Sequence, residues 1–283
     1  MTPLDSTATQ TVAEVDVWNW RKEQIGQSGQ MQPGRDLVAE ECAVALEYNG
    51  ISHAVMMATP DDLEDFALGF SLTEGIVADR SEWYECEVVD GAEGMQVQMR
   101  IASERFVALK EKRRNLTGRT GCGLCGAETL QQAVRHPPAV RSDTAHFSGL
   151  TLHAARLAMQ ERQRLQQRTG ATHAAAWLGS DGEIVLLRED VGRHNALDKL
   201  IGALVLRDVD FASGAVLITS RASYEMVQKA ATVGIGMVAA ISAPTALAIR
   251  LAEECNVTLI GFLREQSHAV YSGRQRLIEL GGS

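Results

Sequence analysis

Apolar runs long enough to cross a membrane are missing from this sequence. The longest, residues 235–241 and 257–263, have the length of a strand rather than of a membrane-spanning helix. Residues 1–16 also lack a basic stretch followed by an apolar one, so we expect no secretory signal. Together these absences predict a cytoplasmic protein that does not bind membranes.

Cysteine is scarce, with five residues in a chain of 283. An odd number of scattered cysteines does not favour a disulfide framework and is typical of proteins from a reducing compartment. Cys122 and Cys125 form the one close pair, and no second pair or histidine motif accompanies them. Because a structural zinc site needs four ligands, we expect no protein-ligated metal.

Positive charge and nucleotide signatures are also lacking. The formal net charge of −9 argues against nucleic acid as a partner. No Gly-x-Gly-x-x-Gly or Walker sequence occurs, which argues against an ordinary nucleotide-binding fold. An anionic ligand would therefore need a local basic site.

The first half of the chain predicts a small α+β subdomain. Residues 38–58 predict a hairpin, because Asn49-Gly50 separates two apolar stretches. Residues 83–101 alternate in the same way and predict a second hairpin. Residues 1–35 are polar and rich in glycine, so we expect a poorly ordered lead-in with one strand near residues 12–20.

A helix is predicted after the first hairpin, from Thr59 to Gly75. The Thr59 hydroxyl would cap it, Pro60 would occupy the first turn, and the apolar residues that follow fall on one face. This pattern predicts a surface helix packed on the hairpin.

The second half alternates strands with helices. Residues 152–167 predict a polar, arginine- and glutamine-rich helix. We then expect strands at 172–178, 183–188, 215–219, 235–241 and 257–262, and helices at 194–206, 224–233 and 245–254. The later strands are almost wholly apolar, as in an α/β sheet covered on both faces.

Four regions follow from these patterns. They are a lead-in (1–35), an N-terminal α+β subdomain with a cysteine loop (36–135), a linker (136–150) and an α/β ligand-binding domain (151–283).

The cysteine pair lies in residues 119–128, Arg-Thr-Gly-Cys-Gly-Leu-Cys-Gly-Ala-Glu. Glycines around Cys122 and Cys125 predict a flexible loop that leaves sulfur exposed. Zinc binding, a redox pair and sulfur transfer all use such a pair. The run of arginines and lysines over residues 100–119 could stabilise a thiolate or dock an acidic partner, although a solvated basic face is the simpler interpretation.

Polar clusters follow several predicted strands. Residues 189–199 include His194, and residues 219–225 include Arg221 and Ser223 before a predicted helix. Residues 262–267 follow the last predicted strand and offer an aromatic ring and a cation. Open α/β sheets bind ligands at the carboxyl ends of their strands, so these clusters predict a site for a nucleotide-like anion.

Taken together, these segments closely resemble the FdhD family of formate dehydrogenase accessory sulfurtransferases. The matching stretches are residues 59–76, 119–126, 189–199, 220–229 and 242–248. The resemblance implies a sulfur carrier that takes persulfide sulfur from a cysteine desulfurase and passes it to the molybdenum bis(molybdopterin guanine dinucleotide) cofactor. That cofactor is then required by formate dehydrogenase. The resemblance also implies a homodimer and a cytidine deaminase-like layered α/β domain.

The resemblance also assigns residues. The family's persulfide cysteine corresponds to Cys122, with Cys125 as its companion. Its cofactor segment corresponds to Phe262, Leu263, Arg264, Glu265, Gln266 and Ser267. This chain departs from the family there, since Glu265 would repel a phosphate. The alternatives are a cofactor-binding chaperone that moves no sulfur and a thiol-disulfide oxidoreductase.

Overall fold

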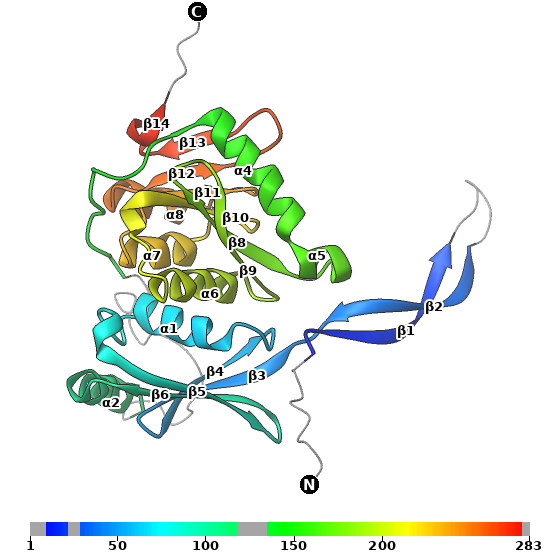
Figure 1. Cartoon of the computed structure of the whole chain (residues 1–283), viewed down its shortest axis with the longest axis horizontal. Coiled ribbons are helices and arrows are strands. Elements are labelled where there is room, and N and C mark those ends of the chain that lie inside the picture. The colour runs from blue at the N-terminus through cyan, green and yellow to red at the C-terminus, as the bar shows by residue number, and fades with distance from the viewer. Residues whose placement is uncertain (1–9, 22–28, 118–134, 279–283) are drawn as a thin grey trace, which may run out of the picture.

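Two β-sheets lie on opposite sides of a layer of helices (Figure 1). The computed structural model describes residues 10–21, 29–117 and 135–278. Within these residues the fold is mixed α/β, as the sequence predicts. The cysteine-bearing residues 119–128 lie outside the described part. The flexibility predicted for their loop therefore stays a prediction.

The first sheet of the described chain has the strand order β4-β3-β6-β5. Its strands are β3 (Cys42–Tyr48), β4 (Ile51–Ala58), β5 (Trp83–Gly91) and β6 (Gly94–Ile101). Both predicted hairpins are confirmed, because β3 pairs with β4 and β5 with β6 in antiparallel fashion. Asn49 and Gly50 both adopt positive φ angles, which explains why Asn-Gly occupies that turn. Helix α2 (Ser103–Thr117) follows β6.

The second sheet of the described chain has the order β13-β12-β11-β10-β8-β9. Its strands are β8 (His173–Gly179), β9 (Ile184–Asp190), β10 (Gly214–Ile218), β11 (Met237–Ala240), β12 (Thr258–Gly261) and β13 (Ala269–Ser272). Five of these strands match the predicted ones. β13 was missed because it is short and half-exposed, and it pairs antiparallel with β12.

Helices cover both faces of the second sheet. α4 (Gly149–Arg162) and α5 (Arg164–Thr169) lie along one face. α6 (Arg193–Val205), α7 (Tyr224–Thr232) and α8 (Ala246–Glu254) lie on the other (Figure 1). Alternate residues of β8 enter different cores: Ala176 packs with the α4 side, and Trp177 packs with the α6 side.

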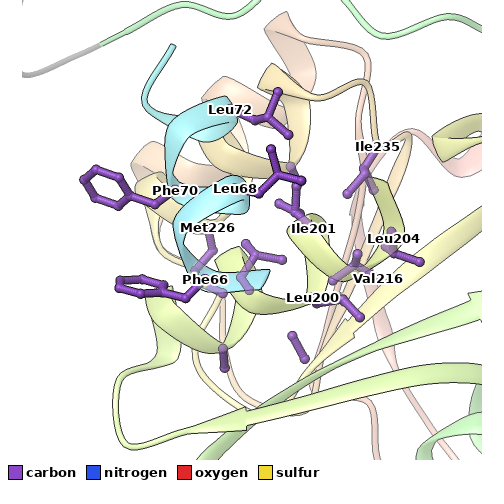
Figure 2. Close-up of a cluster of buried hydrophobic side chains, with 14 of the residues drawn as sticks. Phe66, Leu68, Phe70, Leu72, Leu200, Ile201, Leu204, Val216, Met226 and Ile235 are labelled. Carbon is purple, nitrogen blue, oxygen red and sulfur yellow. The ribbon is translucent and has the colours of Figure 1, made fainter. Parts of the chain in front are cut away.

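Helix α1 (Leu63–Thr73) lies between the first sheet and α6. A Cβ atom on Gly69 would fall 1.8 Å from the Asp198 carbonyl oxygen, and one on Gly202 would fall 1.9 Å from that of Asp65. Only glycines allow the two helix backbones to approach so closely. Figure 2 shows Leu68 and Ile201 turned toward each other, while Phe66 points away from α6.

The prediction of a surface helix at α1 is therefore wrong. Nearly all of its side chains are buried, because both of its faces are covered. Its predicted cap is also wrong. The Thr59 hydroxyl donates to Asp190 Oδ2 at 2.8 Å instead, and the helix begins after Asp62 without a side-chain cap. A buried carboxylate needs donors, and Thr59 supplies two of them.

The lead-in is also more ordered than expected. β1 (Val12–Arg21) and β2 (Gln30–Ala39) form an antiparallel ribbon with ten residue pairs. The single strand expected near residues 12–20 is confirmed, but poor order over the described part of residues 1–35 is wrong. The partner strand was missed because glycine and proline disfavour strands in general, whereas an edge strand tolerates both Pro33 and Gly34.

The predicted linker, residues 136–150, contacts the rest of the protein at several points. Residues 136–146 contain no helix or strand, and Val140 donates a backbone hydrogen bond to Cys255. β7 (Phe147–Ser148) pairs with β14 (Leu277–Ile278). Short 3-10 turns lie at Arg80–Glu82, Phe211–Ser213 and Arg274–Arg276. One hydrophobic cluster joins the first sheet, α1, α6 and the second sheet, so the packing is continuous across the predicted regions.

Candidate functional site

The carboxyl ends of three parallel strands meet at one edge of the second sheet. β10 pairs with β11, and β11 with β12, all in parallel. Loop residues after these strands also bond to one another: Ala222 donates to the Ala243 carbonyl, and Phe262 donates to the Ser242 carbonyl. The polar clusters expected after β10 and β12 therefore do lie at one edge, on either side of the loop that follows β11.

Phe262 begins the last of these loops in a strained conformation. Its φ angle is 50°, in the left-handed region that an aromatic residue rarely adopts. The ring is about half-exposed, and the Arg264 guanidinium lies 6.0 Å from its centroid. Leu263 anchors the loop because its side chain is buried and its amide donates to Ala240. An exposed ring beside a cation suits a planar, anionic ligand.

A cavity of about 550 Å³ opens at the same edge, between the strand ends and helices α4 and α5. Most of its lining residues have polar side chains; they are Arg156, Gln160, Gln163, Gln166, Gly170, Ala171, Thr172, His173, Thr219 and Ile241. Thr219 and Ile241 directly follow β10 and β11, so this cavity belongs to the strand-end site.

Arg156 is the unusual residue of this cavity. Its side chain is 11% exposed, and its Nε and Nη2 atoms are buried without a hydrogen-bond partner in the described structure. The closest carboxylate is Glu265, whose Oε1 atom lies 4.0 Å from Nη2. A buried cation without good partners is costly, and an anion in the cavity would supply the missing acceptors. Arg156 thus connects the cavity to the loop of residues 262–267.

Arg221 and Ser223 flank the same edge from the β10 side. Arg221 is exposed. The Ser223 hydroxyl lies at the start of α7, buried and without a partner among the described atoms. A free hydroxyl at a helix N-terminus can donate to an anion.

His194 lines a different cavity, of about 190 Å³, between α1, α6 and α7. Its Nε2 atom lies 2.7 Å from Glu225 Oε2. Burial lowers the pKa of His194, and the carboxylate of Glu225 opposes this effect only in part. The structure therefore places His194 with Glu225 rather than beside the loop of residues 262–267.

Arg135 borders the His194 cavity and is the first described residue after the cysteine-bearing stretch. Its Nη2 atom donates to Glu74 Oε2 at 2.5 Å, and its carbonyl accepts from the Tyr224 hydroxyl at 2.7 Å. Lys229 contacts Glu74 from the buried side at 3.1 Å. Burial would lower the pKa of Lys229, but Asp198 and Glu74 outweigh it and raise the pKa. Arg135 is thus held by hydrogen bonds and an ion pair to a charged network that includes Glu74 and Lys229.

Comparison with known proteins places the chain in a family. Residues 39–278, most of its length, match the model of the FdhD/NarQ family. The chain belongs to this family. The resemblance drawn from its motifs is confirmed, and the following paragraphs treat the chain as an FdhD/NarQ protein.

Curated relatives cover nearly the whole chain. A sulfur carrier protein FdhD of Cupriavidus necator is 59% identical over 261 residues, which is 92% of this chain and 88% of the relative. A sulfur carrier protein FdhD of Bordetella petrii is 56% identical over 242 residues, 86% of this chain and 87% of the relative.

A solved structure shares the fold. The crystal structure described as a formate dehydrogenase accessory protein of Desulfotalea psychrophila superposes with a TM-score of 0.74. It covers 95% of this chain and all of its own, at 21% identity. Within the part of the chain that the structure describes, no helix is long and apolar enough to cross a membrane.

Residues that sequence reasoning missed come chiefly from α4 of this FdhD/NarQ protein. The stretch was noted for its arginines and glutamines, and that composition was the available signal. Arg156, Gln160 and Gln163 reach the strand ends only because α4 packs along the sheet. Helix periodicity cannot say which sheet edge a helix approaches.

The described cysteines are poor nucleophiles. Burial raises the pKa of Cys86 to about 12 and also raises the pKa values of Cys42 and Cys255. For Cys86 this reduces the thiolate fraction at neutral pH on the order of 1000-fold relative to an unperturbed thiol. Reactive sulfur is therefore expected on Cys122 or Cys125, both outside the described residues.

Alkylation of the folded protein with iodoacetamide at pH 7.5 is expected to modify Cys122 and Cys125 well before the other three cysteines. Peptide mass spectrometry over time gives the rate at each site. Unfolding in urea is the control, because it should equalise all five rates. Labelling of Cys86 in the folded protein at the unfolded rate would contradict the assignment.

Proposed function

We propose that this FdhD/NarQ protein is a sulfur carrier for a molybdenum cofactor. It accepts persulfide sulfur from a cysteine desulfurase on Cys122 and passes it to molybdenum bis(molybdopterin guanine dinucleotide), which formate dehydrogenase then receives. Family membership and the names of the curated relatives support the sulfur-carrying part. A cytoplasmic homodimer and cytidine deaminase-like layering belong to the same proposal.

The sulfur step is a thiolate relay. The Cys122 thiolate attacks the terminal sulfur of the donor persulfide, a new S–S bond forms, and the desulfurase cysteine leaves as a thiolate. The raised pKa values of Cys42, Cys86 and Cys255 support this assignment, because they lower the thiolate fraction of the three other cysteines. Cys125 is proposed to assist its neighbour.

The cofactor is proposed to bind as a substrate at the strand-end site. The buried Nε and Nη2 atoms of Arg156, which have no hydrogen-bond partner among the described atoms, are the observation that carries this half of the proposal, since a pyrophosphate would supply their missing acceptors. The exposed Phe262 ring offers a stacking surface for guanine, and Arg264 adds a second cation. Glu265 is 82% exposed, so it can turn away from Arg156 when an anion enters.

Intact mass spectrometry after incubation with a cysteine desulfurase and cysteine tests the proposed function. The expected product is the protein plus one sulfur atom, and reductant should remove that sulfur. Cofactor binding without any sulfur adduct would instead indicate a chaperone. A mixed disulfide with a substrate protein would indicate a thiol-disulfide oxidoreductase.

Substitutions of Arg156 and Arg264 are expected to weaken nucleotide binding without affecting sulfur loading on Cys122. Loss of a charge-assisted hydrogen bond costs about 1.5–3 kcal/mol, so Arg156→Ala should weaken GDP binding by about 10- to 100-fold. Arg264→Glu should weaken it as well. Both variants should still accept sulfur, because neither Arg156 nor Arg264 takes part in the thiolate relay.

Calorimetric titration with GDP, the nucleotide portion of the cofactor, measures this effect. Arg250→Ala is a matched control that removes an exposed arginine from α8. Unchanged GDP affinity in Arg156→Ala would take the α4 cavity out of the site.

A further inference from the structure

The loop that joins β12 to β13, residues 262–268, is anchored near both of its ends. Leu263 anchors the first end, because its side chain is buried and its amide donates to the Ala240 carbonyl. His268 lies at the other end, one residue before β13 begins. Residues 264–267 between these anchors are exposed. The position of the exposed part therefore depends on what His268 contacts.

His268 packs against the N-terminal half of α4. Its Nδ1 atom lies 3.0 Å from Nε2 of His153, which is a hydrogen-bond distance, and the two rings meet edge to face. A Cβ atom on Gly149 would fall 3.1 Å from Cε1 of His268, so the ring also lies against the first turn of the helix. Gly149 and His153 are four residues apart and share one face of α4. The end of the loop thus has a close contact with this face.

The contact between the two histidines is a hydrogen bond between part-buried rings. Burial and the neighbouring imidazole of His153 lower the pKa of His268, so the His268 ring is neutral at pH 7.5. A neutral imidazole has one donor nitrogen and one acceptor nitrogen. One ring therefore donates and the other accepts, and this hydrogen bond sets both the distance and the direction between helix and loop.

Arg156 approaches the same loop one turn further along α4. Three residues separate it from His153, so both side chains lie on one side of the helix. The Nη2 atom of Arg156 is 4.0 Å from Oε1 of Glu265, in the exposed part of the loop. An ion pair of this length with a carboxylate that is 82% exposed contributes little. Of these two contacts with α4, the hydrogen bond between His153 and His268 therefore holds the loop more firmly.

We propose that the hydrogen bond between His153 and His268 positions the β12–β13 loop for anion binding. It keeps the Phe262 ring and Arg264 close to Arg156, so that both guanidinium groups can contact one pyrophosphate. A loop that is already in place loses less conformational entropy when the ligand binds, which raises the affinity. The ligand is the guanine nucleotide of the proposed function, on which this role rests.

Calorimetric titration of the full chain with GDP at pH 7.5 tests the role of the pair. One neutral hydrogen bond changes affinity by roughly 2- to 10-fold, so His153→Ala and His268→Ala should each weaken GDP binding by that factor. The double alanine variant should bind about as weakly as either single one, because all three lose the same contact. His136→Ala is the matched control, since it removes an exposed histidine that contacts Glu254, and it should bind GDP as the wild type does.

A pair of amide side chains distinguishes positioning from packing alone. Glutamine in place of His153 carries its amide where Nε2 lay, and asparagine in place of His268 carries its amide where Nδ1 lay. His153→Gln/His268→Asn therefore keeps a hydrogen bond across the same gap and should restore most of the GDP affinity. Binding as weak as that of the alanine variants would overturn the proposal.

Hydrogen exchange of the free protein, followed by NMR, tests the positioning role without any nucleotide. The Arg264 amide donates to the Ser267 carbonyl within the loop, and the Leu263 amide donates to Ala240. In both single alanine variants the Arg264 amide should exchange at least ~10-fold faster, while the Leu263 amide stays protected and shows that the sheet edge is intact. Unchanged exchange at Arg264 would overturn the positioning role whatever the GDP titration gives. Failure of the wild type to bind GDP would instead contradict the proposed cofactor site.

Discussion

Cys122→Ala is expected to abolish the reducible one-sulfur adduct that forms with a cysteine desulfurase. The thiolate is the attacking group, and the described cysteines are weaker candidates, because burial raises the pKa values of Cys42, Cys86 and Cys255. We expect adduct formation to fall at least ~100-fold. A strain that depends on this protein should lose formate dehydrogenase activity to a similar degree.

Two further substitutions test whether the loss of the sulfur adduct is specific to Cys122. Cys86→Ala is the matched control, and we expect it to load sulfur normally. Cys125→Ala distinguishes an assisting thiol, which would slow loading, from an obligatory second carrier, which would leave sulfur on Cys122 without transfer to the cofactor. A full adduct on Cys122→Ala would contradict the proposed relay.

Asp190→Ala is expected to cause the largest loss of stability in the described part of the chain. Asp190 and Lys199 are fully buried and their charged atoms lie 2.7 Å apart. Asp190 also accepts hydrogen bonds from Thr59, Gly192 and Asn195. Removing one member of a buried pair leaves an uncompensated charge, which costs about 3–5 kcal/mol.

Urea unfolding followed by circular dichroism measures this cost. Arg141→Ala breaks an exposed ion pair with Asp143 and should leave the unfolding midpoint nearly unchanged, because solvent screens that pair. Lys199→Met should cost less than Asp190→Ala, because the remaining carboxylate keeps its donors from Thr59, Gly192 and Asn195. Equal midpoints for Asp190→Ala and Arg141→Ala would show that the buried pair does not stabilise the fold.

Much of the fold could be predicted from local patterns. Asn49-Gly50 determined a hairpin because both residues tolerate a positive φ. The almost wholly apolar later strands indicated a sheet covered on both faces, and in the structure Ala176 and Trp177 of β8 enter different cores. Polar residues after apolar strands also indicated a shared edge, since parallel strands end on the same side.

Other features depended on contacts between distant segments. Hydrophobic spacing indicated a helix at Leu63–Thr73 but not that both of its faces would be covered. The Thr59 hydroxyl has the chemistry of a cap, yet the buried Asp190 binds it instead. His194 and Phe262 both follow strands, but the intervening sheet and helices place them in different surroundings.

The sequence by itself determined most of the helices and strands and the family, and it singled out the cysteine pair that is proposed to carry sulfur, because each of these follows from short stretches of neighbouring residues. Only the tertiary structure decided that the Nε and Nη2 atoms of Arg156 are buried without a hydrogen-bond partner beside the strand ends, that α1 lies between the first sheet and α6, and that Trp18 and Trp20 of the β1–β2 ribbon are exposed. Burial and pairing depend on which distant segments meet, and local periodicity carries no information about that.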